Sequence, residues 1–236
     1  MKLAVRGDDE LAQAAAAAGA TLTDAETADL VVTVGEAEFV AVARDAPETP
    51  VLPVGADLGP FSLSPARDDL EDALDSLAAA EGSAVAHPVL SATVDGDEVA
   101  RGVLDAMLVT SEPARISEYE VDFGDERVTD FRSDGVVVAT PLGTHGYAHA
   151  AGAPVLQSGT GLAVVPVSPF STRSSTWVAD DDVTLTVARD DGPVSLVVDG
   201  AELQFVEPHQ SVRLRVVDTV DLWRLPEMRL DRLEKL

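Results

Sequence analysis

The spacing of apolar positions divides the chain into a first part that alternates strands with helices and a longer part made mostly of strands. The first part carries a continuous apolar run over 29–34, typical of a strand in a parallel sheet covered on both faces. Asp8 stands where it can cap the first helix, and Gly19 where that helix ends. Strands are expected at 2–5, 29–34 and 50–54, and helices at 10–18, 39–44 and 68–80.

From about residue 84 the pattern changes to closely spaced apolar runs separated by Asp/Gly turns such as Asp95-Gly96 and Asp199-Gly200. One helix, at about 145–151, interrupts this series. Strands are expected at 84–94, 99–110, 115–121, 128–131, 135–139, 161–167, 183–187, 194–198 and 211–217. The β-α-β-α-β-α order predicts a small Rossmann-like α/β domain at 1–83, followed by an all-β, sandwich-like domain at 84–217. The tail 218–236, with a short amphipathic helix at 226–236, is a candidate to return to the first domain.

Composition narrows the class of protein. The formal net charge is −26, from 42 acidic and 16 basic residues, and the only lysines are Lys2 and Lys235. Such a chain repels nucleic acid and anionic membranes, since both are bound through clustered Lys and Arg. Abundant acid with so little lysine suggests a protein built for molar salt, where repulsion between surface charges is screened. Ordinary acidic solubility tuning is the alternative.

The same arithmetic bounds location and chemistry. The sequence contains no cysteine, so disulfides, thiolate metal sites and thiol catalysis are excluded. No apolar run reaches the ~18 residues of a membrane span. Asp8, Asp9 and Glu10 interrupt the N-terminal apolar stretch before a signal-peptide core can develop. A cytoplasmic protein is therefore expected.

The most informative stretch runs over 133–154. An acid, Asp134, precedes a fully apolar strand, and a Thr140-Pro-Leu-Gly143 turn leads into a helix N-terminus. Small side chains and backbone N–H groups converge at such a turn, so a polar ligand can approach the main chain. The alternative is that Pro141 and Gly143 only make the turn. That alternative leaves unexplained why an acid, a Tyr and a Gly-x-Pro exit fall at these offsets.

This stretch resembles the hallmark of the NAD kinase family, an Asp-Gly, an apolar strand, a Thr-Pro-Thr-Gly turn, a Tyr and a closing Gly-Pro. The resemblance extends to 164–169 and to the hairpin at 196–200, and it is weaker before residue 84. Matching positions are Asp134, Gly135, Thr140, Pro141, Gly143, Thr144, Tyr147, Ala151, Gly152 and Pro154.

The resemblance implies an ATP-dependent kinase that phosphorylates the 2′-hydroxyl of the adenosine ribose of NAD, with Mg²⁺ against the phosphate charge. The family's Gly-Gly-Asp-Gly-Thr loop falls on 34–38, where Glu36 takes the place of the catalytic Asp and Gly35 is retained. Val34 and Ala37 replace two glycines, and Glu38 adds a negative charge where the triphosphate would lie. We expect a β-carbon at 34 and 37 to hinder positive-φ geometry and the approach of phosphate. Glu36 is a base candidate or, alternatively, a solvated surface acid.

By the same resemblance, nucleotide-binding roles fall on a set of residues spread over both domains. Asp105 replaces the Asn of the family's Asn-acid pair and Ala106 replaces its acid. Tyr147 has the alternative of packing in the core, and Asp199-Gly200 that of a simple hairpin turn. His145 and His149 are four residues apart and would share a helix face, so a metal is an alternative to a ligand phosphate at His145. The candidates are Gly35, Asp105, Asp134, Thr140, Gly143, Thr144, His145, Tyr147 and Asp199.

Three functions remain open at this point. The first is an NAD kinase that uses NAD and ATP. The second is a catalytically impaired paralogue that binds NAD(P) or another nucleotide as a regulator, as the altered 34–38 loop suggests. A kinase for a different acceptor, such as a lipid, depends on the same loop and is opposed by the same alterations. The resemblance also implies a homodimer or homotetramer formed through the β-rich domain.

Overall fold

The computed structural model describes residues 1–79, 81–112, 115–171, 175–226 and 228. It separates into two compact units, Met1–His87 with the described residues from Thr219 onward, and Pro88–Asp218. Strands β5 (Ser83–Val94) and β16 (Ser211–Arg224) contribute residues to both units. The helix expected at 226–236 lies outside the described residues, apart from Pro226 and Met228.

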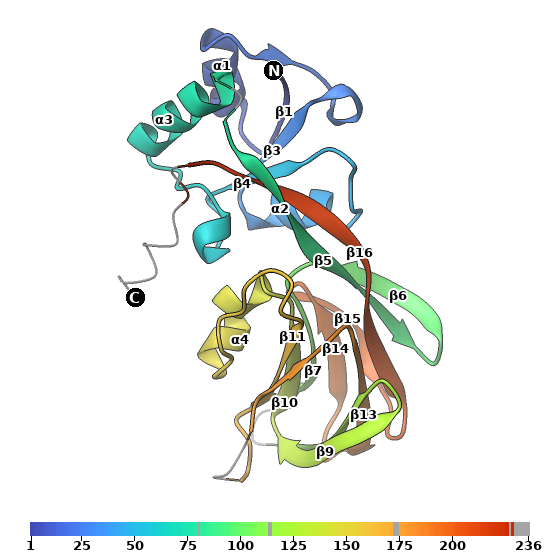
Figure 1. Cartoon of the computed structure of the whole chain (residues 1–236). Helices are drawn as coiled ribbons and strands as arrows, with labels where there is room; N and C mark the ends of the chain where they lie inside the picture. Colours follow the sequence, from blue (N-terminus) through green and yellow to red (C-terminus); the bar gives the residue numbers. More distant parts are fainter. Residues whose placement is uncertain (80, 113–114, 172–174, 227, 229–236) are drawn as a thin grey trace. The chain divides into compact units, whose positions relative to one another are not determined.

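The first unit is a parallel sheet in the order β2-β1-β3-β4, extended by the end of β16 at Leu222. Helices α1 and α3 bury Ala15, Ala73 and Leu77 in the apolar cluster on one face, whereas α2 buries Phe39 outside that cluster. Asp8 caps α1 as predicted, accepting hydrogen bonds from the N–H groups of Glu10 and Leu11. The elements are β1 (Lys2–Arg6), α1 (Asp9–Ala17), β2 (Thr21–Leu22), η1 (Ala25–Thr27), β3 (Leu30–Val34), α2 (Glu36–Ala43), β4 (Val51–Val54), η2 (Gly59–Phe61) and α3 (Arg67–Ala78), coloured from blue to blue-green in Figure 1.

The second unit is a sandwich of two mainly antiparallel sheets. One sheet contains β5, β6, β16, β13, β8 and β9, and the other has the order β12-β11-β10-β7-β14-β15. Side chains of both sheets form one core that includes Leu108, Leu185 and Leu196. The remaining elements are β6 (Asp97–Gly102), β7 (Asp105–Thr110), β8 (Ser117–Phe123), β9 (Glu126–Ser133), β10 (Gly135–Ala139), η3 (Gly143–His145), α4 (Tyr147–Ala150), β11 (Leu162–Val167), β12 (Trp177–Ala179), β13 (Asp182–Arg189), β14 (Val194–Val198) and β15 (Ala201–Val206) (Figure 1). An α/β unit followed by a β-sandwich confirms the predicted fold class.

Burial on both faces explains why β10 reads as a continuous apolar run instead of an alternating one. Val136 and Val138 enter the sandwich core, while Val137 and Ala139 pack outward against Ala148 of α4. Helix α4 and the loop after it therefore cover the outer face of β10 and β11, visible in yellow in Figure 1. This packing fixes the position of the turn that leads from β10 into α4.

Three local expectations were wrong. The single strand expected at 99–110 is two strands, β6 and β7, which belong to different sheets and meet at a corner over residues 103–104. The single helix expected at 145–151 is a 3₁₀ turn followed by the four-residue α4, because Gly146 has a non-helical backbone (φ −101°, ψ −129°). The helix expected at 39–44 is α2, which begins at Glu36 because Gly35 is its N-cap.

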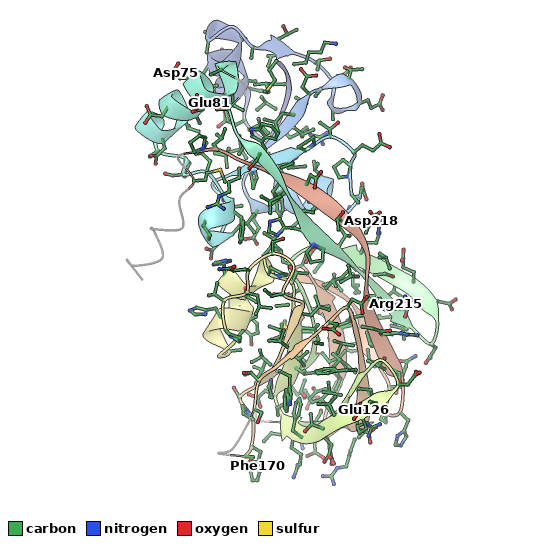
Figure 2. All side chains as sticks on the ribbon, in the orientation of Figure 1. Asp75, Glu81, Glu126, Phe170, Arg215 and Asp218 are labelled. Atoms are coloured by element: carbon green, nitrogen blue, oxygen red, sulfur yellow. The ribbon has the colours of Figure 1, made fainter. Side chains whose placement is uncertain are left out.

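No helix in the described part of the chain is long and apolar enough to cross a membrane. Charged side chains lie mainly on the surface, as the labelled Glu126, Arg215 and Asp218 illustrate (Figure 2). Several arginines pair with acids there. Arg127, for example, contacts Asp122 at 2.6 Å and Glu120 at 2.9 Å.

Candidate nucleotide site

The end of β10 docks onto the corner between β6 and β7. Ala139 pairs with Asp105 in the sheet register, and the next residue, Thr140, donates its backbone N–H to the carbonyl of Leu104 at 2.9 Å. The Thr140 hydroxyl donates to the carbonyl of Val103 at 2.6 Å and accepts the N–H of Gly143 at 3.3 Å. Thr140 is fully buried. Its side chain therefore builds the turn and does not face solvent.

Gly143 and Thr144 complete the same turn. A β-carbon on Gly143 would lie 2.0 Å from the carbonyl oxygen of Leu104, so only glycine fits at this approach. Thr144 is also fully buried. Its hydroxyl donates to the carbonyl of Pro141 at 2.8 Å and accepts the N–H of Leu156 at 3.0 Å. These two candidate residues hold the turn together from inside.

The residues after this turn include side chains that are exposed to solvent. Tyr147, the first residue of α4, is 48% exposed, so the alternative that its ring packs in the core does not hold. His145 ends the 3₁₀ turn and His149 lies in α4, where its Nδ1 is 3.3 Å from the carbonyl oxygen of Ala153. Because the helix is interrupted at Gly146, His145 and His149 do not lie on one continuous helix, contrary to the expectation that they share a helix face. The described residues contain no group of three or more His, Asp or Glu arranged to hold a metal ion.

Asp199 binds the backbone of residues 103–105 from the other side of the corner. Its Oδ2 accepts the N–H of Val103 at 2.9 Å, and its Oδ1 accepts those of Leu104 at 2.8 Å and Asp105 at 3.1 Å. The backbone N–H of Asp199 donates to the carbonyl of Asp105 at 2.9 Å. The hairpin alternative also holds, since Asp199 and Gly200 have positive φ values of 46° and 77° and join β14 to β15 in a two-residue turn.

Asp134 lies at the opposite end of β10. Asp134 is six positions before Thr140 along the chain, which at strand spacing is about 20 Å. Its backbone pairs there with Val167 and Thr110. Tyr119 is buried nearby, and desolvation together with the negative charge of Asp134 raises the pKa of its phenol against the hydrogen bonds from Thr110 and Ser117, which lower it. Within one chain, the second unit thus brings together Asp105, Thr140, Gly143, Thr144 and Asp199, but not Asp134.

The remaining candidates, Gly35 and Glu36, belong to the first unit. Gly35 follows β3 with φ +87° and leads into α2, whose first turn carries Glu36, which is exposed, and Glu38. The first N–H groups of a helix have no partner inside the helix and attract anions. Glu38 lies 3.7 Å from the guanidinium of Arg6, which offsets part of its charge. A carboxylate and a set of backbone donors therefore meet in one turn.

The positive-φ geometry that a β-carbon was expected to hinder at Val34 and Ala37 is not required there. Val34 is the last residue of a strand and Ala37 lies inside a helical turn, and neither has positive φ. Only Gly35 needs the left-handed region that glycine tolerates. The altered loop thus keeps the one glycine that has positive φ, and Glu38 adds a negative charge to the helical turn that follows it.

Sequence reasoning missed two glycines that accompany Gly35. Gly7 follows β1 with φ +90° and Gly55 follows β4 with φ +66°, so three neighbouring parallel strands each end in a glycine of positive φ. A β-carbon on Gly7 would lie 2.6 Å from the carbonyl oxygen of Val34. Open α/β sheets bind ligands at the carboxyl ends of their strands. A glycine directly after each apolar strand was the available signal.

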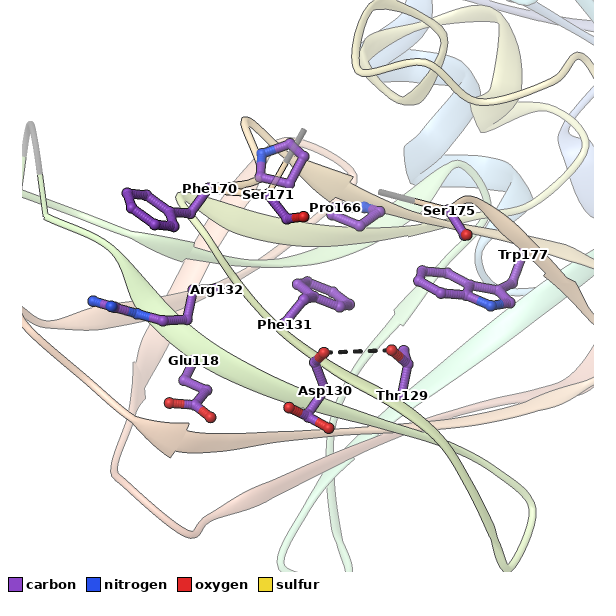
Figure 3. A pocket seen from close by; sticks show the side chains of 11 residues that line it. Glu118, Thr129, Asp130, Phe131, Arg132, Pro166, Phe170, Ser171, Ser175 and Trp177 are labelled. Carbon is purple, nitrogen blue, oxygen red and sulfur yellow. Dashed lines mark hydrogen bonds between the residues drawn. The ribbon is translucent and has the colours of Figure 1, made fainter. Parts of the chain in front are cut away.

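A cavity of about 420 Å³ in the second unit contains none of the predicted residues. Its floor holds Phe131 and Trp177, whose rings stack with centroids 6.1 Å apart (Figure 3). Arg132 stands at one end, over the ring of Phe170 and 3.2 Å from Asp191. Apart from Asp134, the predicted residues are instead at the corner of 103–105, in the turn and helix that follow β10, or at the end of β3, so cavity volume does not mark the candidate site.

Comparison with known proteins decides the family. The family model described as ATP-NAD kinase C-terminal domain matches residues 104–221, half of the chain. This chain belongs to the NAD kinase family. The NAD kinase of Symbiobacterium thermophilum is 34% identical over 211 residues, which cover 85% of this chain and 74% of that protein. The NAD kinase of Methanosarcina mazei is 30% identical over 125 residues, which cover 52% of this chain but only 43% of that protein. The chain thus spans less than half the length of some relatives that it matches.

Solved structures agree with the fold. The crystal structure of an NAD kinase from Archaeoglobus fulgidus in complex with ATP has a TM-score of 0.76 at 16% identity, covering 100% of this chain and 98% of that one. Yeast NADH kinase complexed with NADH has a TM-score of 0.73, also at 16% identity, over 92% of this chain and 69% of that one. At this identity the likeness establishes the architecture alone.

Proposed function

We propose that this chain is an active NAD kinase, which transfers a phosphoryl group from ATP to the 2′-hydroxyl of the adenosine ribose of NAD and produces NADP. In this proposal the β-rich unit binds the dinucleotide, and the predicted limits 1–83 and 84–217 separate the two functional domains. Family membership supports the reaction type. The relatives named above as NAD kinases support the choice of NAD and ATP as substrates.

The observation that carries the proposal is the first turn of α2. Glu36 is exposed there, at the carboxyl end of β3, beside backbone N–H groups that are free to receive a phosphate. A carboxylate at this point can accept the proton of the ribose hydroxyl while that oxygen attacks the γ-phosphorus. The leaving ADP keeps the electron pair of the bond between its β-phosphate oxygen and the γ-phosphorus, so one P–O bond forms and one breaks. In this proposal Glu36 supplies the acid and the first N–H groups of α2 supply the phosphate cradle.

Mg²⁺ is the cofactor that the family implies, and the donor set of the described residues fits it in one way. Carboxylate oxygens are its preferred protein ligands, and kinase sites hold it with one or two carboxylates plus substrate phosphates. Glu38, in the same first turn of α2 as Glu36, is the acid that would hold the Mg²⁺ ion, which leaves Glu36 as the base. When bound with ATP, the ion would neutralise phosphate charge. Glu38 would then oppose nucleotide binding only when the metal is absent.

The test is formation of NADP by Glu36→Gln. General base catalysis contributes about 10²–10⁴-fold, so we expect Glu36→Gln to lose at least 100-fold in kcat with little change in the affinity for NAD. Glu48→Gln is the matched control, since Glu48 is an exposed acid of the same unit that precedes β4 and so lies at the opposite edge of the sheet. Equal turnover of Glu36→Gln and wild type would remove the base from the proposal.

The second candidate function is nucleotide binding without phosphoryl transfer. The observation that favours it is the pair of acids, Glu36 and Glu38, in one exposed turn, since two carboxylates repel a triphosphate. Calorimetric titration separates the two. A folded wild-type protein that binds NAD or NADP but forms no NADP from ATP, or from polyphosphate, would favour the regulator.

We also propose that the protein works in a cytoplasm of molar salt, as expected of a haloarchaeal-type member of the family. The support is the charge of −26 and the two lysines. At 1 M salt the Debye length is about 3 Å, compared with about 10 Å at 0.1 M, so repulsion in the acidic shell is largely screened. Salt also screens the acids of the α2 turn against the incoming phosphates.

A homodimer or homotetramer formed through the β-rich unit completes the proposal. Its support is the exposure of apolar side chains on the two edge strands of the second sheet. Phe205 and Leu203 of β15 are 59% and 40% exposed, and Val178 of β12 is 48% exposed. Sedimentation equilibrium in molar KCl tests it, and a monomer at micromolar protein would contradict it.

A further inference from the structure

The corner over residues 103–105 is held from two sides by unrelated parts of the chain. On one side stand the three N–H bonds accepted by the carboxylate of Asp199. On the other, Thr140 bonds the carbonyls of Val103 and Leu104, and Gly143 approaches the Leu104 carbonyl too closely for any β-carbon. The N–H groups of the corner thus face the β14–β15 turn, and the carbonyls of Val103 and Leu104 face the β10–α4 turn.

The space for the Asp199 carboxylate is also made by a glycine. A β-carbon on Gly102 would lie 2.6 Å from Cγ1 of Val198 and 3.2 Å from Oδ1 of Asp199. Val103 is fully buried and Leu104 nearly so, so N–H groups left without an acceptor there cannot all turn to water. A charged acceptor shared by three N–H groups is stronger than a neutral one. The corner therefore depends on a carboxylate, and not merely on a tight turn.

We propose that Asp199 is a positioning residue for the nucleotide site and not a ligand of the nucleotide. Its carboxylate fixes the backbone of 103–105. That backbone fixes the start of β7, which carries Asp105. It also carries the carbonyls that Thr140 and Gly143 contact, and so fixes the position of the turn that leads to Tyr147. This role rests on the proposed function, because it requires NAD to bind at this end of the second sheet.

A second Asp-Gly hairpin in the same unit offers a matched comparison. Asp95 and Gly96 join β5 to β6 with φ values of 53° and 94°, the same two-residue geometry as Asp199 and Gly200. The carboxylate of Asp95 accepts a hydrogen bond from the side-chain amide of Gln210 at 2.7 Å, in an exposed position. The two turns therefore share residue type and backbone conformation and differ in what the carboxylate holds.

The experiment compares Asp199→Asn with Asp95→Asn. Asparagine tolerates positive φ as well as aspartate does, so neither change strains its turn. In Asp199→Asn one acceptor oxygen is replaced by an NH₂ group that faces an N–H donor. We expect at least a 10-fold higher KM for NAD with kcat changed less than threefold, and faster hydrogen exchange of the amides of Val103, Leu104 and Asp105. Asp95→Asn should match the wild type in all three.

A second pair of variants keeps the proposal testable if Asp199→Asn does not fold. Thr140→Val removes the hydroxyl that bonds the Val103 carbonyl, and Thr140→Ser keeps it. We expect a raised KM for NAD in the first and near wild-type KM in the second. Unchanged KM in both Asp199→Asn and Thr140→Val would overturn the positioning role. Loss of kcat alone in Asp199→Asn would also overturn it. A wild-type protein that binds no NAD, NADP or ATP would instead overturn the proposed function, and this role with it.

Discussion

Substitution of Gly143 by alanine is expected to displace the turn that carries Tyr147. The new β-carbon would lie 2.0 Å from the carbonyl oxygen of Leu104 and 2.5 Å from its carbonyl carbon, whereas contacts below 3.0 Å are essentially never seen for real β-carbons. The turn or the corner must therefore move by about 1 Å. The obstacle is backbone, held by Asp199 and by Thr140, so no side chain can swing away to make room.

The cost follows from overpacking. Extra carbon in a well-packed site destabilises by about 1–3 kcal/mol, and a clash with fixed backbone belongs at the upper end. For a chain of this size about 3 kcal/mol lowers the melting temperature by roughly 6–12 °C. Because the displaced turn leads to the exposed Tyr147, we also expect affinity for NAD to fall at least 10-fold. Calorimetric melting and NAD titration in molar KCl measure the two effects.

The matched control is Gly192→Ala. Gly192 lies between β13 and β14, and its φ is not positive. The atoms nearest to a β-carbon there are Cβ and Cγ of Arg115 and Cβ of Glu112, at the ordinary contact distance of 3.4–3.5 Å. Gly192→Ala should melt within about 2 °C of the wild type. If Gly143→Ala melts and binds NAD as the wild type does, the close approach to Leu104 does not fix the turn, and the reasoning fails.

Three further predictions concern charge. Glu38→Gln should raise the Mg²⁺ concentration needed for half-maximal turnover, and higher turnover at low Mg²⁺ would show instead that Glu38 only repels ATP. His87 is fully buried edge-on to Phe61, and desolvation lowers its pKa to about 4. Since the unfolded state then binds more protons than the native state below pH 6.5, stability should fall between pH 6.5 and 4 by about 3 kcal/mol. His87→Gln should flatten that part of the urea-unfolding profile, and an unchanged slope would contradict it. The melting temperature of the wild type should rise by several degrees from 0.1 to 1 M KCl and change less beyond, as screening saturates; a flat profile over 0.1–1 M would contradict the halophilic proposal.

The pattern of apolar residues predicted strand bounds correctly where a strand is buried along its whole length. The bounds of β10 and β14 agree with the expectation from the sequence, because both strands are buried along their whole length and end at strong turn residues. The division between β6 and β7 was missed because the apolar pattern continues across Val103 and Leu104 while the chain passes from one sheet to the other. β15 was missed because five of its six residues are exposed at a sheet edge, where no apolar alternation is required.

At the candidate site, too, the sequence predicted which residues lie near one another but not what their side chains contact. The resemblance placed Thr140, Gly143 and Thr144 in one turn, but it could not show that both threonine hydroxyls are used inside that turn. The loss of two glycines predicted that 34–38 would be hindered in the geometry of a phosphate loop. Backbone angles show that only Gly35 requires glycine, which residue identity alone does not reveal. The role of Asp199 depends on three long-range hydrogen bonds to residues 94–96 positions away, beyond the reach of local sequence pattern.

Whether the altered loop transfers phosphate is measured most directly as NADP formation by the wild-type protein from NAD, ATP and Mg²⁺ across 0.1–3 M KCl. We expect NADP production that increases with KCl and is reduced at least 100-fold by Glu36→Gln. Folded wild-type protein that binds NAD at molar KCl and yet forms no NADP at any salt concentration, from ATP or from polyphosphate, would contradict this expectation.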